Sequence, residues 1–224
     1  ERLARHAPAC VADLEEHVPA LPLVDLDRDR PGGRRVDGVG DEVQQDLLER
    51  AALPRVVAIG ETGLDYYGME DRKGGRSIAD LEWQRDRFRT HIRAARACGL
   101  PLVIHTRSAS DDTLAILREE GEDGAGNRCG GVFHCFTESG EVARAALDLG
   151  YYISFSGIIT FKSAQALRDV VALVPMDRML IETDSPYLAP VPFRGKTNSP
   201  AYVPHVAQQI AQVRALAVEA VAEA

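Results

Sequence analysis

Short apolar runs alternate with amphipathic stretches from residue 53 onward, and this alternation most strongly limits the folds open to the 224-residue chain. The apolar runs do not alternate apolar with polar residues, which is typical of strands buried on both faces of a parallel sheet. They are Arg55–Gly60, Pro101–His105, Gly131–Phe136, Tyr151–Ser156 and Met179–Thr183. Helices are predicted over Gln84–Cys98, Ser110–Glu120, Ser139–Leu149, Ser163–Val174 and from Pro204 onward. Strand–helix repeats without a glycine-rich phosphate loop predict the α/β class, as a (β/α)8 barrel or an open doubly wound sheet.

The first 52 residues do not show this repeat. They offer a possible helix over Ala9–His17, a short apolar run over Leu21–Leu26 and a polar, Gly- and Arg-rich stretch over 27–40. A second helix, predicted over Asp41–Ala52, leads into the first clear strand. We therefore predict an atypical N-terminal segment over 1–52, in which 21–26 could supply one strand, and a barrel domain over 53–224.

Composition narrows the classes of function. The chain has 26 Lys and Arg residues against 34 Asp and Glu residues, a net charge of −8. Because nucleic acid is negatively charged, this balance argues against binding to phosphates through charge alone. An acidic protein can still act on phosphates when bound metal ions supply positive charge. The apolar runs fall short of the roughly 18 residues that a membrane span needs. The four cysteines form no CxxC pair, which indicates reduced thiols and a cytoplasmic protein, and no obligate protein partner is evident.

Four residues that can bind metals lie at or just past the ends of predicted strands. They are Glu61, His105, His134 and Asp184. In parallel α/β folds this edge of the sheet is where active sites are built, and two imidazoles with two carboxylates suit Zn²⁺, Mn²⁺ or mixed divalent metals. Each residue taken alone is more readily explained by packing, for the histidines, or by helix capping, for the carboxylates. Four of them on successive strand ends make a metal or catalytic site as good an explanation as these.

Several motifs, in order, resemble the TatD-related deoxyribonucleases. They are GETGLDYY (60–67), PLVIHTR (101–107), FHCF (133–136), SFSG (154–157) and IETDSPY (181–187), and the similarity extends through RGKTNSP (194–200). It covers roughly residues 55–215. The resemblance implies a TIM-type (β/α)8 barrel that hydrolyses phosphodiester bonds in DNA, single-stranded or at ends, with two divalent ions (Mg²⁺, Mn²⁺ or Zn²⁺).

The resemblance also implies roles for the four residues. Glu61 would bridge two metal ions, His105 and His134 would complete the shell of one ion, and Asp184 would bind the other and help activate water. In two-metal catalysis the cations lower the pKa of a bound water and offset charge on the phosphate.

The sequence departs from the family at one motif. Family members begin with a strand that ends in His-x-His, and this chain has no His-x-His. We therefore expect a barrel incomplete at its N-terminal strands, with fewer than two metal ions as an alternative. Two other functions stay open: an inactive remnant that binds metal or nucleic acid without turnover, and a related metal hydrolase that acts on another ester or an amide.

Residues near these motifs are secondary candidates. Arg107, Arg194 and Lys196 could contact substrate phosphates, with surface salt bridging as the alternative. Asp65 is expected to order its loop or support a ligand rather than bind metal. His91 falls inside the predicted helix over 84–98, and we expect it on that helix's surface.

Overall fold

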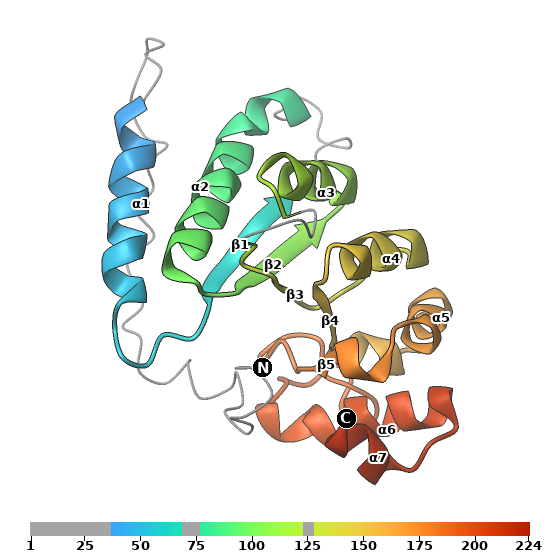
Figure 1. Ribbon diagram of the computed structural model, residues 1–224. Helices are drawn as coiled ribbons and strands as arrows, with labels where there is room; N and C mark the ends of the chain where they lie inside the picture. Colours follow the sequence, from blue (N-terminus) through green and yellow to red (C-terminus); the bar gives the residue numbers. More distant parts are fainter. Residues whose placement is uncertain (1–36, 69–76, 123–127) are drawn as a thin grey trace. The chain divides into compact units, whose positions relative to one another are not determined.

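The computed structural model describes residues 37–68, 77–122 and 128–224. The predicted helix over 9–17 and the apolar run over 21–26 lie outside these residues. The described part contains a parallel sheet whose five strands stand side by side in chain order, β1-β2-β3-β4-β5 (Figure 1). The strands are β1 (Ile59–Asp65), β2 (Leu102–Arg107), β3 (Gly131–Phe133), β4 (Tyr152–Phe155) and β5 (Met179–Ile181).

This strand order decides between the two architectures that the pattern left open. A doubly wound sheet reverses its strand order at a switch point, whereas a TIM barrel adds each new strand beside the previous one. All four pairings here are parallel and join strands that are consecutive in the chain. The fold is therefore of the TIM type, as predicted.

Helices connect the strands and pack on the sheet and on one another (Figure 1). Their bounds are α1 (Asp37–Ala51), α2 (Glu82–Cys98), α3 (Ser110–Glu119), α4 (Gly140–Asp148), α5 (Gln165–Leu173), α6 (Val203–Arg214) and α7 (Val218–Glu223). Short 3₁₀ turns lie at Ile78–Leu81, Gly157–Thr160, Met176–Arg178 and Pro200–Tyr202. Helix α2 ends where the sequence predicts, because Gly99 takes the left-handed conformation that glycine adopts without a Cβ penalty. Within the described residues, no helix combines the length and apolar character that crossing a bilayer requires.

Side chains from the short strands form the centre of the core. Leu102, Ile104, Phe133, Ile153 and Phe155 have no exposed surface. Removing apolar surface from water at about 25 cal/mol per Å² is the main favourable contribution to folding. The continuous apolar runs that predicted buried strands are therefore the residues that hold the sheet in place.

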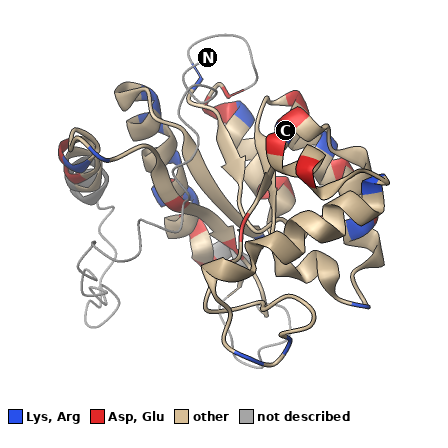
Figure 2. Cartoon of the chain, turned by 90° about the horizontal axis from the view of Figure 1, so that it is seen from below, with Lys and Arg blue, Asp and Glu red and all other residues tan. Residues whose placement is uncertain are grey.

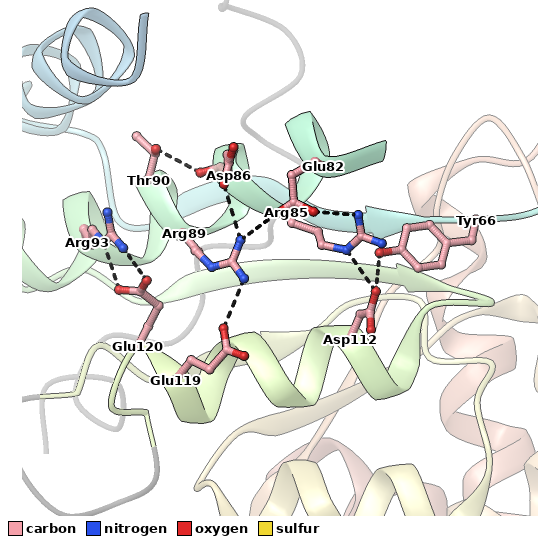
Figure 3. Close-up of polar contacts among 10 residues, drawn as sticks. All are labelled: Tyr66, Glu82, Arg85, Asp86, Arg89, Thr90, Arg93, Asp112, Glu119 and Glu120. Carbon is pink, nitrogen blue, oxygen red and sulfur yellow. Dashed lines mark hydrogen bonds and ion pairs between the residues drawn. The ribbon is translucent and has the colours of Figure 1, made fainter. Parts of the chain in front are cut away.

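Helices α2 and α3 are joined by a row of ion pairs, which we call the α2–α3 network (Figure 3). It pairs Arg85 with Asp112 at 3.0 Å, Arg89 with Glu119 at 3.1 Å and Arg93 with Glu120 at 2.6 Å. The three arginines are four residues apart, so they share one face of α2. Tyr66, just after β1, donates a hydrogen bond of 2.6 Å to Asp112 and ties the end of β1 to this network.

Two sequence expectations are wrong in detail. The first strand is displaced, since it covers Ile59–Asp65 rather than 55–60, and Glu61 lies inside it rather than past its end. The reason is pairing: residues 62–65 pair with residues 104–107 of β2. His91 is buried instead of exposed, and its Nδ1 lies 2.7 Å from the carbonyl oxygen of Arg87.

Candidate metal centre

The four predicted strand-end residues come together at the carboxyl edge of the sheet. Glu61 and His105 lie within β1 and β2, His134 follows β3 directly, and Asp184 lies three residues past β5. Glu61 Oε1 is 2.9 Å from His105 Nδ1 and 3.6 Å from His134 Nε2. His134 Nε2 is in turn 3.8 Å from Asp184 Oδ1. Both imidazoles thus direct one nitrogen toward Glu61.

The other nitrogen of each imidazole faces a second carboxylate. His105 Nε2 lies 3.4 Å from Asp65 Oδ2, and His134 Nδ1 lies 2.9 Å from Glu182 Oε1. Outer carboxylates of this kind fix the orientation and tautomer of histidines that bind metals. We call the six residues Glu61, Asp65, His105, His134, Glu182 and Asp184 the strand-end cluster.

Glu182 is the member that sequence reasoning missed. Donor atoms of His134, Glu182 and Asp184 all lie within 4.8 Å of one another, a spacing that could hold a metal ion. The Ser154 hydroxyl on β4 donates a 2.5 Å hydrogen bond to Glu182 Oε2 and helps to hold the carboxylate. A signal was available, because Glu182 and Asp184 are two residues apart just after a strand and therefore tend toward the same side.

Gly63 allows the backbone of β2 to approach β1 closely at His105. It lies opposite His105 in the β1–β2 register and has a φ of +137°. A Cβ at this position would collide with the carbonyl oxygen of His105. Glu61 and Asp65 lie two residues on either side of Gly63, so the imidazole sits between two carboxylates of the same strand.

The electrostatics of the cluster follow from these contacts. The hydrogen bond from His105 lowers the pKa of Glu61, and the same contact raises the pKa of His105. Burial disfavours charge on His134, but Glu182 and the other carboxylates outweigh it and raise the pKa of that imidazole. Burial raises the pKa of Asp184, and repulsion from Glu182 and Glu61 adds to the effect. An excess of carboxylates creates a negative potential that favours a cation.

Backbone strain marks the same edge. Asp184 has a φ of +57°, Cys135 beside His134 has +43°, and Ser108 beside Arg107 has +54°. Left-handed conformations cost non-glycine residues about 1–3 kcal/mol each and concentrate at functional sites. Three loops leaving the sheet are thus held in costly conformations next to the cluster.

The three predicted phosphate-binding residues are placed differently. Arg107 contacts Asp65 through two hydrogen bonds of 2.7 and 3.2 Å and lies 4.4 Å over the Tyr67 ring. Arg194 and Lys196 lie in the loop between β5 and α6, over Phe161 at 3.9 Å and Phe193 at 6.0 Å. Among the described residues, the ion pairs of the strand-end cluster include Arg107 but neither Arg194 nor Lys196.

A groove of about 350 Å³ opens beside the cluster. Glu61, Asp65 and His105 line it together with Trp83 and Arg87 of α2. A larger hollow of about 500 Å³ lies elsewhere, along α6 and α7, and its lining contains no member of the cluster. The smaller groove is the one that adjoins carboxylates and imidazoles with shifted pKa values, as functional pockets do.

The fold and the cluster together define a TIM-type α/β protein with a carboxylate–imidazole site at the carboxyl ends of its strands. The sequence model of the TatD-related DNase family matches residues 33–224. The chain belongs to this family.

Individual relatives agree with this assignment. A protein named as an uncharacterized metal-dependent hydrolase, YcfH of Escherichia coli K12, is 52% identical over 179 residues, which are 80% of this chain and 63% of YcfH. The protein of Escherichia fergusonii named 3'-5' ssDNA/RNA exonuclease TatD is 35% identical over 176 residues, 76% of this chain and 63% of that protein. The crystal structure of YjjV, a TatD homologue of Escherichia coli K12, superposes with a TM-score of 0.69 at 29% identity, over 84% of this chain and 67% of YjjV. The chain thus spans 63% of the length of YcfH and of the E. fergusonii exonuclease.

Proposed function

We propose that this chain is a metal-dependent hydrolase of phosphodiester bonds, with single-stranded DNA as its substrate. The observation that carries the proposal is the convergence of Glu61, His105, His134 and Asp184 at one edge of the sheet, with Glu61 Oε1 within 3.6 Å of a nitrogen of each imidazole. We further propose that the hydrolase domain covers residues 53–224.

The donor set fits divalent cations. Carboxylate oxygens and imidazole nitrogens together suit Zn²⁺ and Mn²⁺, and carboxylates with water suit Mg²⁺. Glu61, His105, His134 and Asp184 would hold the metal. A bound divalent ion supplies Lewis acidity: it lowers the pKa of a water and offsets negative charge on the phosphate.

The chain's own side chains supply orientation and a base. Glu182 holds the His134 ring through a 2.9 Å contact with Nδ1, so that Nε2 faces Glu61 and Asp184. Asp184 has a raised pKa because it is partly buried and faces other carboxylates. Its Oδ1 lies 3.8 Å from His134 Nε2, which places the carboxylate beside the position of a bound metal, so we assign the removal of a proton from the attacking water to Asp184.

Basic and aromatic side chains near the cluster support a nucleic-acid substrate. Arg107 presents a half-exposed guanidinium beside His105, and Arg194 and Lys196 lie on the loop after Asp184. Tyr67 and Tyr187 expose 64% and 70% of their surface, enough for an aromatic face to stack on a base. Basic and acidic residues are mixed along the helices and form no basic surface there (Figure 2). Metal ions bound at the strand-end cluster would therefore have to supply the positive charge that attracts phosphates. The name of the E. fergusonii relative favours single-stranded DNA or RNA as the first substrate to test.

The test is hydrolysis of a short single-stranded DNA by the purified chain with Mn²⁺ or Mg²⁺ and with EDTA, for the wild type and Glu61→Ala. We expect both EDTA and the substitution to abolish turnover. Glu49→Ala, at an exposed glutamate of α1, is the matched control and should keep wild-type turnover. Metal-dependent hydrolysis that survives Glu61→Ala would show that the site is assigned to the wrong residues.

One sequence feature favours a second candidate, a protein that binds metal without turnover. The 224 residues contain no His-x-His, the motif that the resemblance described above leads us to expect. Calorimetry with Zn²⁺ separates the two candidates when it is run beside the hydrolysis assay. Zinc binding that Glu61→Ala abolishes, in a folded protein that cleaves no DNA, would select the second candidate.

A further inference from the structure

Asp65 contacts both a histidine of the strand-end cluster and Arg107. Its Oδ2 lies 2.7 Å from Arg107 Nη2 and 3.4 Å from His105 Nε2. Its Oδ1 accepts hydrogen bonds from Arg107 Nε at 3.2 Å and from the Tyr67 backbone N–H at 2.9 Å. One carboxylate therefore contacts the side chains of two residues that project from β2.

The backbone of Asp65 is held by two neighbouring elements. Its N–H donates to Oε1 of Gln84 on α2 at 3.0 Å, and the Gln84 amide donates back to the Asp65 carbonyl at 3.4 Å. On the other side Asp65 is paired in register with Arg107 of β2. The carboxylate thus sits on a fixed part of the fold, as accurate placement of a partner group requires.

The contact with His105 has a defined consequence for metal binding. Nδ1 of this ring faces Glu61, so Nε2 must lie on the far side, where Asp65 is. A carboxylate on the far nitrogen fixes the orientation of the ring, with the near nitrogen aimed at Glu61 and the metal, and loss of such a partner typically weakens metal binding 10–100-fold.

The contact with Arg107 has a consequence for phosphate binding. The guanidinium is held by Asp65 on one edge and by the Tyr67 ring 4.4 Å below its plane, yet the side chain stays 50% exposed. A guanidinium has five N–H donors, and the two used on Asp65 leave others for an anion. Holding the group in place beforehand reduces the entropy lost when a phosphate binds.

We propose that Asp65 is a positioning residue that acts on both halves of the site, orienting His105 for the metal and Arg107 for a substrate phosphate. This inference rests on the proposed function and adds a residue that couples metal binding to substrate binding. Asp65 itself touches neither the metal nor the reacting phosphate.

The test compares Asp65→Asn, Arg107→Gln and the double variant with the wild-type chain. Zinc affinity is measured by competition with a chromogenic chelator, without substrate, and KM and kcat are measured on single-stranded DNA. We expect Asp65→Asn to weaken zinc binding about 10–100-fold and to raise KM about 10-fold. Arg107→Gln should raise KM to a similar extent and leave zinc affinity within about twofold. The double variant should raise KM no further than Arg107→Gln alone, because the two residues act on the phosphate as one unit.

Asp46→Asn is the matched control, since Asp46 also pairs with an arginine through both oxygens, Arg50 on α1, each at 2.8 Å. It should change neither readout. Zinc affinity and KM of Asp65→Asn that both stay within twofold of wild type would overturn the proposal, as would a change in only one of them. Fully additive KM effects in the double variant would overturn it as well.

Two further points keep the test decisive. If Asp65→Asn does not melt cooperatively, Asp65→Glu replaces it, because this variant keeps the charge and moves it by one methylene. A wild-type chain that binds zinc but cleaves no DNA contradicts the proposed function, while the zinc affinity of the Asp65 variant still tests the His105 half of this inference. A wild-type chain that binds no zinc contradicts both.

Discussion

The α2–α3 network and the strand-end cluster are both dense in charged side chains, but their charges are balanced differently. In the network every carboxylate pairs with an arginine, whose charge is permanent. Three arginines of α2 contact carboxylates on or just past α3, and two of the three also contact carboxylates of α2 itself (Figure 3). In the cluster, four carboxylates face two imidazoles and Arg107. The comparison teaches that the partner of a carboxylate separates the two regions: an arginine makes a structural ion pair, whereas an imidazole can also bind a metal.

The exposed pairs of the network add little stability. Asp112 and Glu119 expose 41% and 57% of their side chains, so each of these pairs contributes about 0–1 kcal/mol, whereas Glu120 is more buried. The cluster holds His134, Glu182 and Asp184 in partly buried positions next to strained backbone. Repulsion between the partly buried carboxylates destabilises the fold, and a bound cation would relieve this repulsion.

The largest effect is expected from removing a ligand of the cluster. His134→Ala should lower metal-dependent hydrolysis about 10³-fold, equivalent to about 4 kcal/mol of transition-state stabilisation, and should weaken zinc binding. Steady-state kinetics and chelator competition measure both. Turnover unchanged by this substitution would contradict the comparison, because the imidazole would then be only a structural partner of its carboxylates.

A buried ion pair beyond the end of α3 should give the largest effect on stability. Glu122 is fully buried and accepts hydrogen bonds from Arg96, Tyr151 and the backbone N–H groups of Cys129 and Gly130. Glu122→Gln removes the charge and should cost about 3 kcal/mol at neutral pH, since it leaves Arg96 without its buried partner. Urea unfolding measures the loss, and Glu119→Gln at an exposed site serves as its control.

This stability has a defined pH dependence. Burial alone would raise the pKa of Glu122, but Arg96 and the backbone donors outweigh it, so the pKa lies below the ordinary value of 4.5. A depressed folded-state pKa contributes stability that is fully present above the unfolded value and is lost as the pH falls through the folded one. The difference between wild type and Glu122→Gln should therefore shrink below about pH 4.5. A difference that stays constant down to pH 3 would contradict this cause.

Gly63→Ala tests the space that His105 occupies. The added Cβ would collide with the His105 carbonyl at a φ that L-residues avoid, so we expect a loss of about 2 kcal/mol or more in unfolding free energy. Gly99→Ala is the control, because Gly99 also has a positive φ but open space around it. Equal losses at both positions would mean that backbone strain alone, and not the packing of β1 on β2, sets the cost.

The smallest effect is expected in the α2–α3 network. Arg89→Ala should change the unfolding free energy by less than about 1 kcal/mol, because its partners Glu82, Asp86 and Glu119 are mostly exposed. Zinc affinity should stay unchanged. A marked loss of zinc affinity in this variant would show that the α2–α3 network contributes to metal binding and is not only a structural contact.

By itself, the sequence determined the fold class and picked out four residues that the fold brings together in the candidate site. Continuous apolar runs predict buried parallel strands, and the structure contains a parallel sheet in which every strand overlaps a predicted one. Four residues that can bind metals were recognisable because strand ends converge in any parallel α/β fold. Family motifs pointed to the TIM type, and the strand order and the solved relative confirm it.

Only the tertiary structure decided how those residues are arranged. Glu61 lies inside β1 because that strand continues along β2 past Gly63, a pairing between residues about 40 positions apart that local pattern does not reveal. Glu182 and Asp65 became site residues through contacts with His134 and His105 on other strands. His91 is buried because α2 turns that side of the helix inward. Apolar periodicity reports which residues leave water, whereas the partner of each polar group depends on chain segments that only the fold brings together.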